Sequence, residues 1–322
     1  MGTVVALSGQ VGGAKLAEGL YRLRGKNLAV VCNTGDDYEY LGLAIAPDLD
    51  TTLFSLAGIA SPSAGWEPAG ETQNLYRMVR ALGGPDRVPL GDQATALALL
   101  RADGLRNDRR LTEISLDFCQ HLGVDARILP MSDDPVRTYV QLEDGSVTFQ
   151  DYFAQLACEP PVKGFQYAGA EDARIPEEVM DALHAEDLEA VVICPCNPYH
   201  VIRPILAVNG MSEMLKKRGA PVIAVTPIVG GKALKGSAGK MMAELGHEVS
   251  ARAVALEYLR LIDGFVIDSE DEVHSDGILA SGIEVLMANT IMRNADDRLR
   301  LARTVLDFAH AIRERKAAEL DA

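Results

Sequence analysis

The chain has 322 residues, of which 48% are hydrophobic and 24% charged, proportions typical of a globular enzyme. Its 46 acidic and 31 basic side chains give a net charge of −15, which argues against nucleic acid as a partner, because binding it requires lysine and arginine at the phosphates. No apolar run approaches the about 20 residues that span a bilayer, and a strand pattern begins directly after Met1 and Gly2. We therefore expect no membrane partner, no secretory signal and a cytoplasmic location.

Valine-rich apolar runs alternate with helical stretches from the start of the chain. Residues 3–8 predict a strand, residues 14–24 a helix and residues 28–33 a second strand. These runs are continuous rather than alternating between apolar and polar residues, a pattern typical of parallel strands buried on both faces.

The middle of the chain has a different pattern. Residues 61–127 are mainly helical, with amphipathic stretches such as "QATALALLRADGL". Residues 138–153 predict a hairpin that turns at Asp144 and Gly145. We therefore expect a smaller helical portion that is inserted into the sheet or caps it.

The second half returns to alternating strands and helices, ending in a long charged helix from Asp296 onward. Strands are expected at 190–195, 221–229, 264–269 and 282–289, and helices near 211–218, 238–245 and 251–261. The sequence thus predicts an α/β fold with a Rossmann-like, mostly parallel, doubly wound sheet. Residues 1–60 and 128–322 are expected to form the core, and 61–127 the insertion.

Glycines and a lysine are crowded at the first strand–helix junction, "ALSGQVGGAKLAEGL". The nucleoside-triphosphate loop pattern fails because Ala14 stands where its second glycine belongs, and the dinucleotide fingerprint fails on spacing. Backbone N–H groups at Gly9, Gly12 and Gly13, with Lys15 nearby, still suit a phosphate at a helix N-terminus. The alternative is a tight turn that needs its glycines only for backbone shape.

Acidic and amide side chains follow the second strand. In a doubly wound sheet they would face the glycine segment, because the carboxyl ends of successive strands line one crevice. Carboxylates beside a phosphate call for a divalent cation, and Mg²⁺ commonly takes one or two carboxylates plus phosphate oxygens. The alternative is helix capping and turn formation. The residues concerned are Asn33, Asp36, Asp37, Asp48 and Asp50.

Two later loops also carry polar residues where strands end. Asp134 and Arg137 lie in "LPMSDDPVRT", where the arginine either grips an anion or forms a surface ion pair. Asn197 and Pro198 lie in "CPCNPYHVIRPIL", where the amide either contacts a base or sugar or closes the turn. His200 lies nearby, although a lone histidine is more often a surface or packing residue.

A second glycine-rich stretch, "TPIVGGKALKGSAGKMM", is unusually basic for this acidic chain. We call it the lysine loop; it contains Lys232, Lys235 and Lys240. Two loops suited to anions on one sheet indicate a ligand with separate phosphate and nucleoside parts.

Several blocks of the sequence resemble the CofD family, the 2-phospho-L-lactate transferases and related enzymes of coenzyme F420 biosynthesis. In chain order they are "LSGQVGGAKLAEGL", "NTGDD", "GLAIAPDLDTTLFSLAG", "LGDQATALALLR", "ILPMSDDPVRTYV", "CPCNPYHVIRPIL", "VTPIVGGKALKGSAGKMM" and "VLMANTIMRNADDRLRLA". The resemblance extends from about residue 3 to 305.

This resemblance implies a magnesium-dependent transferase. Its donor would be a guanylylated three-carbon acid (lactyl, enolpyruvyl or glyceryl), and its acceptor Fo, the deazaflavin precursor with a ribityl chain. The terminal ribityl hydroxyl would attack the phosphorus that bears the acid, GMP would leave, and F420-0 or its dehydro or glyceryl analogue would form. A homodimer is also implied.

The resemblance also implies roles for the residues already named. Asp37 and Asp50 would be catalytic and would hold Mg²⁺, with Asp48 in support, and one of them is a candidate to accept the hydroxyl proton. The segment from Gly9 to Lys15 and Asn33 would surround the diphosphate.

The remaining residues are expected farther from the metal. Asn197 and Pro198, together with the lysine loop, would bind the guanosine side. Asp134 and Arg137 would lie nearer the acceptor or the acid.

One departure from the family concerns Gln10, where members usually carry a glycine. A side chain there is expected to contact the ligand or narrow the loop, which bears on donor preference. The alternative function is a non-enzymatic, nucleotide-sugar-binding regulator of the related fold. An NAD oxidoreductase is disfavoured by the missing fingerprint.

Overall fold

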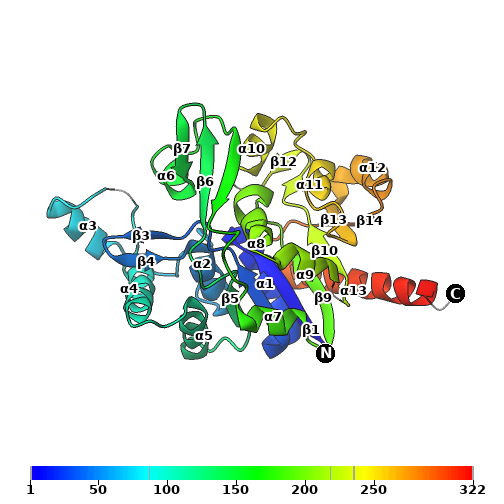
Figure 1. Cartoon of the computed structure of the whole chain (residues 1–322), viewed down its shortest axis with the longest axis horizontal. Helices are drawn as coiled ribbons and strands as arrows, with labels where there is room; N and C mark the ends of the chain where they lie inside the picture. The colour runs from blue at the N-terminus through cyan, green and yellow to red at the C-terminus, as the bar shows by residue number, and fades with distance from the viewer. Residues whose placement is uncertain (1, 87, 218, 235, 321–322) are drawn as a thin grey trace.

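Seven parallel strands form the central sheet of the structure, a computed structural model that describes residues 2–86, 88–217, 219–234 and 236–320 (Figure 1). Every neighbouring pair described in this sheet runs parallel. In order across the sheet the strands are β14 (Glu284–Ala288), β13 (Gly264–Asp268), β10 (Val222–Val225), β9 (Leu188–Ile193), β1 (Thr3–Ser8), β2 (Leu28–Cys32) and β5 (Arg127–Pro130).

The apolar runs explain this sheet, because β1, β2, β9, β10 and β13 are buried along their whole lengths. In the centre, Leu7 of β1 pairs with Val31 on one side and Ile193 on the other. On one side of β1 lie β2 and then β5, the next strands of this sheet along the chain. On the other side lie β9, β10, β13 and β14, in chain order. The predicted Rossmann-like, doubly wound α/β fold is thus confirmed, and its strand order reverses between β1 and β9.

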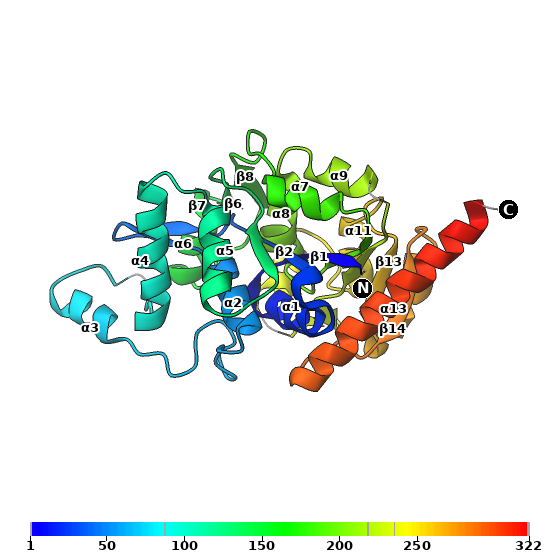
Figure 2. The same cartoon turned by 90° about the horizontal axis from the view of Figure 1, so that it is seen from below.

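Helices cover both faces of the sheet, as Figure 2 shows. On one face α1 (Gln10–Arg24) packs against α13 (Ala295–Leu320) and α2 (Pro47–Leu56). On the other face lie α7 (Glu177–Leu183), α8 (Arg203–Ala207) and α9 (Met211–Lys217). No helix in the described part of the chain is both long enough and apolar enough to cross a membrane.

Short elements complete the described part of the fold. A two-stranded hairpin and three helices surround the far end of the sheet, and three short segments of other helical types connect elements. They are β11 (Ile228–Val229), β12 (Lys232–Ala233), α10 (Ala238–Glu244), α11 (Ala251–Glu257), α12 (Ser275–Leu279), the 3₁₀ turns Gly25–Asn27 and Ser269–His274, and the π turn Pro198–Ile202.

Between α2 and β5 the chain forms α3 (Asn74–Ala81), α4 (Asp92–Arg106) and α5 (Leu111–His121). Helix α4 packs on a small hairpin, β3 (Tyr38–Tyr40) and β4 (Leu43–Ile45), through a second apolar cluster around Ile45 and Ala98. Helix α5 instead joins the main core through Leu111 and Cys119. The mainly helical character of 61–127 matches the prediction, whereas its division from the core as a unit remains a prediction.

A three-stranded antiparallel sheet stands above the carboxyl ends of the central strands (Figure 1). Its order is β7 (Gly145–Thr148), β6 (Arg137–Leu142), β8 (Gly164–Ala168), and α6 (Phe149–Ala154) follows β7. The predicted hairpin is present as β6–β7, with Leu142 opposite Gly145, but residues 149–153 of its predicted second strand are helical and belong to α6. The third strand was not predicted.

Candidate functional site

The site lies where the strand order of the central sheet reverses, because in doubly wound sheets ligands bind in the crevice outside the carboxyl ends of the strands at that point. Gly9 follows β1, Asn33 follows β2, and Asn197 lies four residues beyond β9. These three junctions, far apart in sequence, are neighbours because β1 pairs with both β2 and β9.

The first junction is a helix start and not the open glycine loop that the sequence predicts. Strand β1 ends at Ser8, Gly9 is the extended residue before the helix, and α1 begins at Gln10. Gly12 and Gly13 therefore lie in the first turn of α1. Helix formation here is a correction of the predicted start near residue 14.

Close packing explains these glycines. A Cβ on Gly9 would stand 2.5 Å from Asp48 Oδ2, and one on Gly12 would stand 2.6 Å from the Pro195 carbonyl oxygen. A Cβ on Gly13 would meet two side-chain atoms at 2.5 Å. The glycines thus let α1 approach the loop after β9. Whether the same backbone also holds a phosphate stays a prediction.

Gln10 has a left-handed backbone, with φ of +52°. Its N–H donates to Asp48 Oδ1 at 2.7 Å, and its side-chain Nε2 lies 3.2 Å from Nε2 of His200. The side chain that the family pattern does not anticipate therefore contacts a buried histidine of this chain.

Asp48 is held from two sides. Besides Gln10, Asn33 Nδ2 donates to its Oδ2 at 2.9 Å and also to the His200 carbonyl at 3.2 Å. Burial raises the pKa of Asp48 to about 6, and the charge of Asp36 adds to the rise. Asn33 thus ties the end of β2 to α2 and to the turn after β9.

His200 and Asp36 form a buried pair, with Nδ1 of the ring 2.8 Å from Asp36 Oδ2. The ring stacks on Phe149, with centroids 3.8 Å apart and planes 14° from parallel. Burial lowers the pKa of His200 to about 4 and raises that of Asp36 well above its usual range. From the sequence, His200 is expected to be a surface or packing residue more often than a site residue, and no spacing connects it to Asp36.

Asp37, like Asp36, carries a carboxyl oxygen without a hydrogen-bond partner among the described groups. Among the described residues no donor reaches its buried Oδ1. Burial raises its pKa well above the usual range, Arg137 and Arg101 oppose that rise, and Asp48 and Asp50 add to it. These influences place three of the predicted aspartates and two arginines in one neighbourhood.

Asp50 is not open in this structure, because Arg101 of α4 forms an ion pair with it. Arg101 Nη1 also donates to the Ala44 carbonyl at 2.9 Å, and its guanidinium lies 5.8 Å from the centre of the Phe118 ring. The Arg101 side chain is 3% exposed, so this pair is buried. Arg101 was not predicted as a site residue. The signal available in the sequence was a single basic residue among the alanines and leucines of "QATALALLRADGL".

A divalent cation fits only part of the predicted ligand set. No three acidic, histidine or cysteine side chains in the described ranges are placed to hold a metal together. Asp48 is occupied by Gln10 and Asn33, and Asp50 by Arg101. The unpartnered oxygen of Asp37 has the hard, anionic chemistry that Mg²⁺ prefers, and Mg²⁺ needs few protein ligands beside phosphate oxygens.

The other predicted residues near the crevice have structural partners. Arg137, at the start of β6, donates to the Val136 carbonyl at 2.6 Å. Asp134 accepts from the Arg174 N–H at 2.9 Å, which holds its loop.

Asn197 closes the turn after β9 by accepting from the backbone N–H of Tyr199 at 2.9 Å, and Pro198 begins the π turn. Lys15 donates to the Met292 carbonyl at 3.1 Å, toward α13. Their predicted ligand contacts remain predictions.

In the lysine loop, Lys232 is exposed on β12. Lys240 on α10 pairs with Glu244 at 2.5 Å and with the Tyr152 hydroxyl at 3.1 Å, which ties α10 to α6. Lys235 lies outside the described residues.

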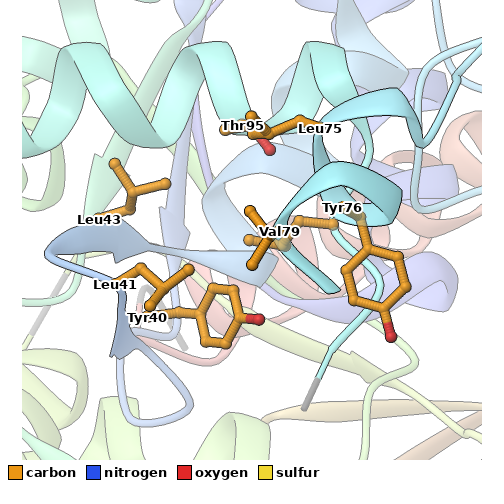
Figure 3. A pocket seen from close by; sticks show the side chains of 8 residues that line it. Tyr40, Leu41, Leu43, Leu75, Tyr76, Val79 and Thr95 are labelled. Carbon is orange, nitrogen blue, oxygen red and sulfur yellow. The ribbon is translucent and has the colours of Figure 1, made fainter. Parts of the chain in front are cut away.

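An apolar hollow lies between the β3–β4 hairpin and α3 (Figure 3). Tyr40, Leu41 and Leu43 of the β3–β4 hairpin face Leu75, Tyr76 and Val79 of α3 across it, with Leu90 and Thr95 completing the lining. Leu41 and Leu75 are about half exposed. None of the predicted site residues lines this hollow, which belongs to the β3–β4 hairpin, α3 and the start of α4.

Comparison with known proteins shows which family the sequence matches. Residues 4–291 match the model of the family described as 2-phospho-L-lactate transferase CofD. The chain is 35% identical over 304 residues to a 2-phospho-L-lactate transferase of Methanosarcina acetivorans, covering 94% of this chain and 98% of that one. It is 35% identical over 318 residues to a phosphoenolpyruvate transferase of Kitasatospora aureofaciens, covering 96% and 98%.

Among solved structures, the chain is similar to a Bacillus halodurans protein of the UPF0052 family. The TM-score is 0.60 and the identity 16%, with 95% of this chain and 98% of that chain covered. At this identity the likeness concerns the fold alone.

Proposed function

We propose, since this chain belongs to the CofD family of transferases, that it moves a phospho-three-carbon-acid group from a GDP-linked donor to the ribityl hydroxyl of Fo. The main support is the buried carboxylate cluster at the strand-order reversal, in which Asp37 has an unpartnered oxygen and Arg137 lies close by. The two named relatives differ in their acid, so phospholactyl, phosphoenolpyruvyl and phosphoglyceryl donors all stay candidates.

In the proposed reaction the terminal hydroxyl oxygen of the acceptor attacks the phosphorus that bears the acid, and the bond to GMP breaks. The hydroxyl proton passes to a carboxylate of the cluster, Asp37 or Asp50. Such transfers depend mostly on positioning and charge stabilisation. Arg137 and the N-terminal turn of α1 are the groups of this chain that would orient the diphosphate.

Mg²⁺ is the cofactor we propose, and it would neutralise charge on the transferred phosphoryl group and the leaving GMP. Asp37 is the residue best fitted to hold it. The Oδ1 atoms of Asp36 and Asp37 both lack a partner among the described groups, but Asp36 is already held by His200 through its Oδ2. Asp48 and Asp50 would not bind the cation directly, because Asp48 already accepts hydrogen bonds from Gln10 and Asn33 and Asp50 is paired with Arg101. Their charges would support it from the surrounding shell.

The apolar hollow has a volume of about 30 Å³, so we propose it as a contact for one edge of the ring system of the acceptor and not as an enclosing seat. Replacing Leu75 by Asp places a charge on this exposed wall without removing a core residue. We expect the KM for Fo to rise about tenfold or more, with the KM for the donor unchanged, because apolar burial of a ring contributes on this scale. Steady-state kinetics with each substrate varied in turn would check this.

The decisive experiment incubates the protein with Mg²⁺, Fo and each of the three donors and follows GMP release and product mass. Asp37→Asn is expected to lower turnover at least a hundredfold while leaving the melting temperature nearly unchanged, because the amide keeps the size of the side chain and replaces a carboxyl group whose Oδ1 has no donor among the described residues. Asp103→Asn, an exposed aspartate on α4, is the matched control.

Two outcomes would contradict the proposal. Full turnover by Asp37→Asn would remove the role of that carboxylate. Binding of the donor without turnover on any donor would favour the nucleotide-binding regulator instead.

A further inference from the structure

Gln10 is exceptional among the residues with a left-handed backbone. In the described part of the chain the other non-glycine residues with positive φ are all in turns, whereas Gln10 begins a long helix next to the site. The turn residues are Leu41, Asp108, Ala157, Cys158 and Arg260. Left-handed backbone is unfavourable for any residue with a Cβ and free of that cost for glycine. Such strain persists where the surroundings impose it, often at functional sites.

The side chain of Gln10 makes a contact that a glycine could not. Its amide Nε2 lies 3.2 Å from Nε2 of His200 and therefore donates to that ring nitrogen. The ring must then carry its proton on Nδ1, which donates to Asp36 Oδ2 at 2.8 Å. Gln10 thus selects the tautomer that can bind Asp36.

The Asp36–His200 contact in turn holds the segment that carries Asp37. That segment is also closed by the Gly35 N–H, which donates to Asn33 Oδ1 at 2.8 Å. Stacking of His200 on Phe149 leaves the ring little freedom to turn, so its ring proton decides whether Asp36 is bound.

We propose that Gln10 is a positioning residue: its side chain fixes the Nδ1–H tautomer of His200, and through His200 and Asp36 it orders residues 33–37. The backbone strain at Gln10 is the local cost of that contact. The ordering itself does not depend on the proposed function, whereas its kinetic consequence rests on it.

The first test uses Gln10→Gly, which removes the strain and the contact together. We expect the melting temperature to rise by about 2 °C. Amide hydrogen exchange in residues 33–37 should nevertheless become about tenfold faster, because the segment loses its tie. Arg260→Gly, which relieves the same strain at an exposed turn, should raise the melting temperature without changing that exchange.

These readouts separate positioning from a structural role. A general structural role predicts that stability and local order fall together. Unchanged exchange in residues 33–37 in Gln10→Gly would overturn the proposal. Gln10→Ala keeps the backbone strain and loses the contact with His200. Its melting temperature should therefore fall, and hydrogen exchange in residues 33–37 should become faster.

The second test measures the tautomer itself. In protein labelled with ¹⁵N-histidine, the His200 ring should show a protonated Nδ1 and an unprotonated Nε2 in the wild type and a mixture in Gln10→Gly. The signal is assigned by its absence in His200→Gln. A wild-type ring protonated on Nε2 would overturn the proposal without any substrate being present.

The kinetic test depends on the proposed function. With an active donor, kcat should fall about tenfold in Gln10→Gly with KM changed less than twofold, the size of effect typical when a supporting group is lost. Unchanged kcat beside faster exchange would confine the role of Gln10 to local order. An inactive wild type would contradict the proposed function and leave the exchange and tautomer results to decide the inference.

Discussion

At the scale of single residues, the site is built from buried charges whose partners come from distant segments. The Arg101–Asp50 pair joins α4 to α2 and is buried on both sides. The family resemblance assigns Asp50 to a metal, whereas the structure pairs it with Arg101. An Asp50→Asn change would therefore leave the Arg101 charge buried without its counterion.

Removing one partner of this pair should destabilise the protein strongly. We expect Arg101→Met to lower the free energy of unfolding by about 3 kcal/mol, because it leaves the carboxylate of Asp50 buried and uncompensated. The double variant Arg101→Met with Asp50→Leu should recover most of that loss. Urea unfolding of the three proteins measures this, and equal stability of the single and double variants would contradict it.

Site residues that lie in one segment of the chain were predictable from the sequence, whereas contacts between distant segments were not. Asp37, Asp48 and Asp50 were predicted because they lie in the same segment of chain after one strand. The contact of His200 with Asp36 spans 164 positions and that of Arg101 with Asp50 spans 51. No local pattern encodes such pairings, because tertiary packing determines them.

At the scale of elements, the start of α1 determines the shape of the site. A glycine in a helix interior normally destabilises it relative to alanine. At Gly12 we expect the opposite, so that alanine is less stable than glycine. A Cβ there would stand 2.6 Å from the Pro195 carbonyl oxygen, a backbone atom that cannot move aside.

We expect Gly12→Ala to lower the free energy of unfolding by about 2 kcal/mol, as overpacking does. Gly277→Ala on α12 is the control, since its Cβ would meet only the flexible Arg252 side chain at 2.9 Å and should cost little. Thermal unfolding compares the two. Equal stability of both variants would show that α1 can shift without cost.

The long elements were predictable and the short ones were not. Continuous apolar runs identified the central strands, because burial on both faces leaves a strong pattern. The hairpin β3–β4 has strands of three residues, and β8 is only partly buried along its length, so neither shows a clear periodicity. Glycines suggested a loop after β1, whereas helix packing required them.

At the scale of the whole molecule, buried titratable groups couple stability to pH. The pKa of His200 is lowered to about 4 from 6.5, so the unfolded chain binds more protons at this residue between those values. Stability contributed by His200 is therefore complete above pH 6.5 and is lost as pH falls to about 4.

The free energies of unfolding of the wild type and of His200→Gln should therefore depend differently on pH. The stability of the wild type relative to the variant is expected to fall by about 3 kcal/mol from pH 6.5 to pH 4 and to stay constant above pH 7. Urea unfolding across this range gives the difference directly. A difference that does not vary with pH would contradict the burial of a neutral ring.

The strand order also has a consequence during synthesis. Strand β1 is wholly buried, with four apolar residues at its centre, and lies in the middle of the sheet, yet its neighbour β9 comes from residues 188–193. Until the ribosome has delivered β9, an emerging N-terminal half that has already paired β1 with β2 presents a bare, apolar strand edge, the feature most prone to aggregation. Protein synthesised at a high rate should therefore depend on chaperones that shield this edge.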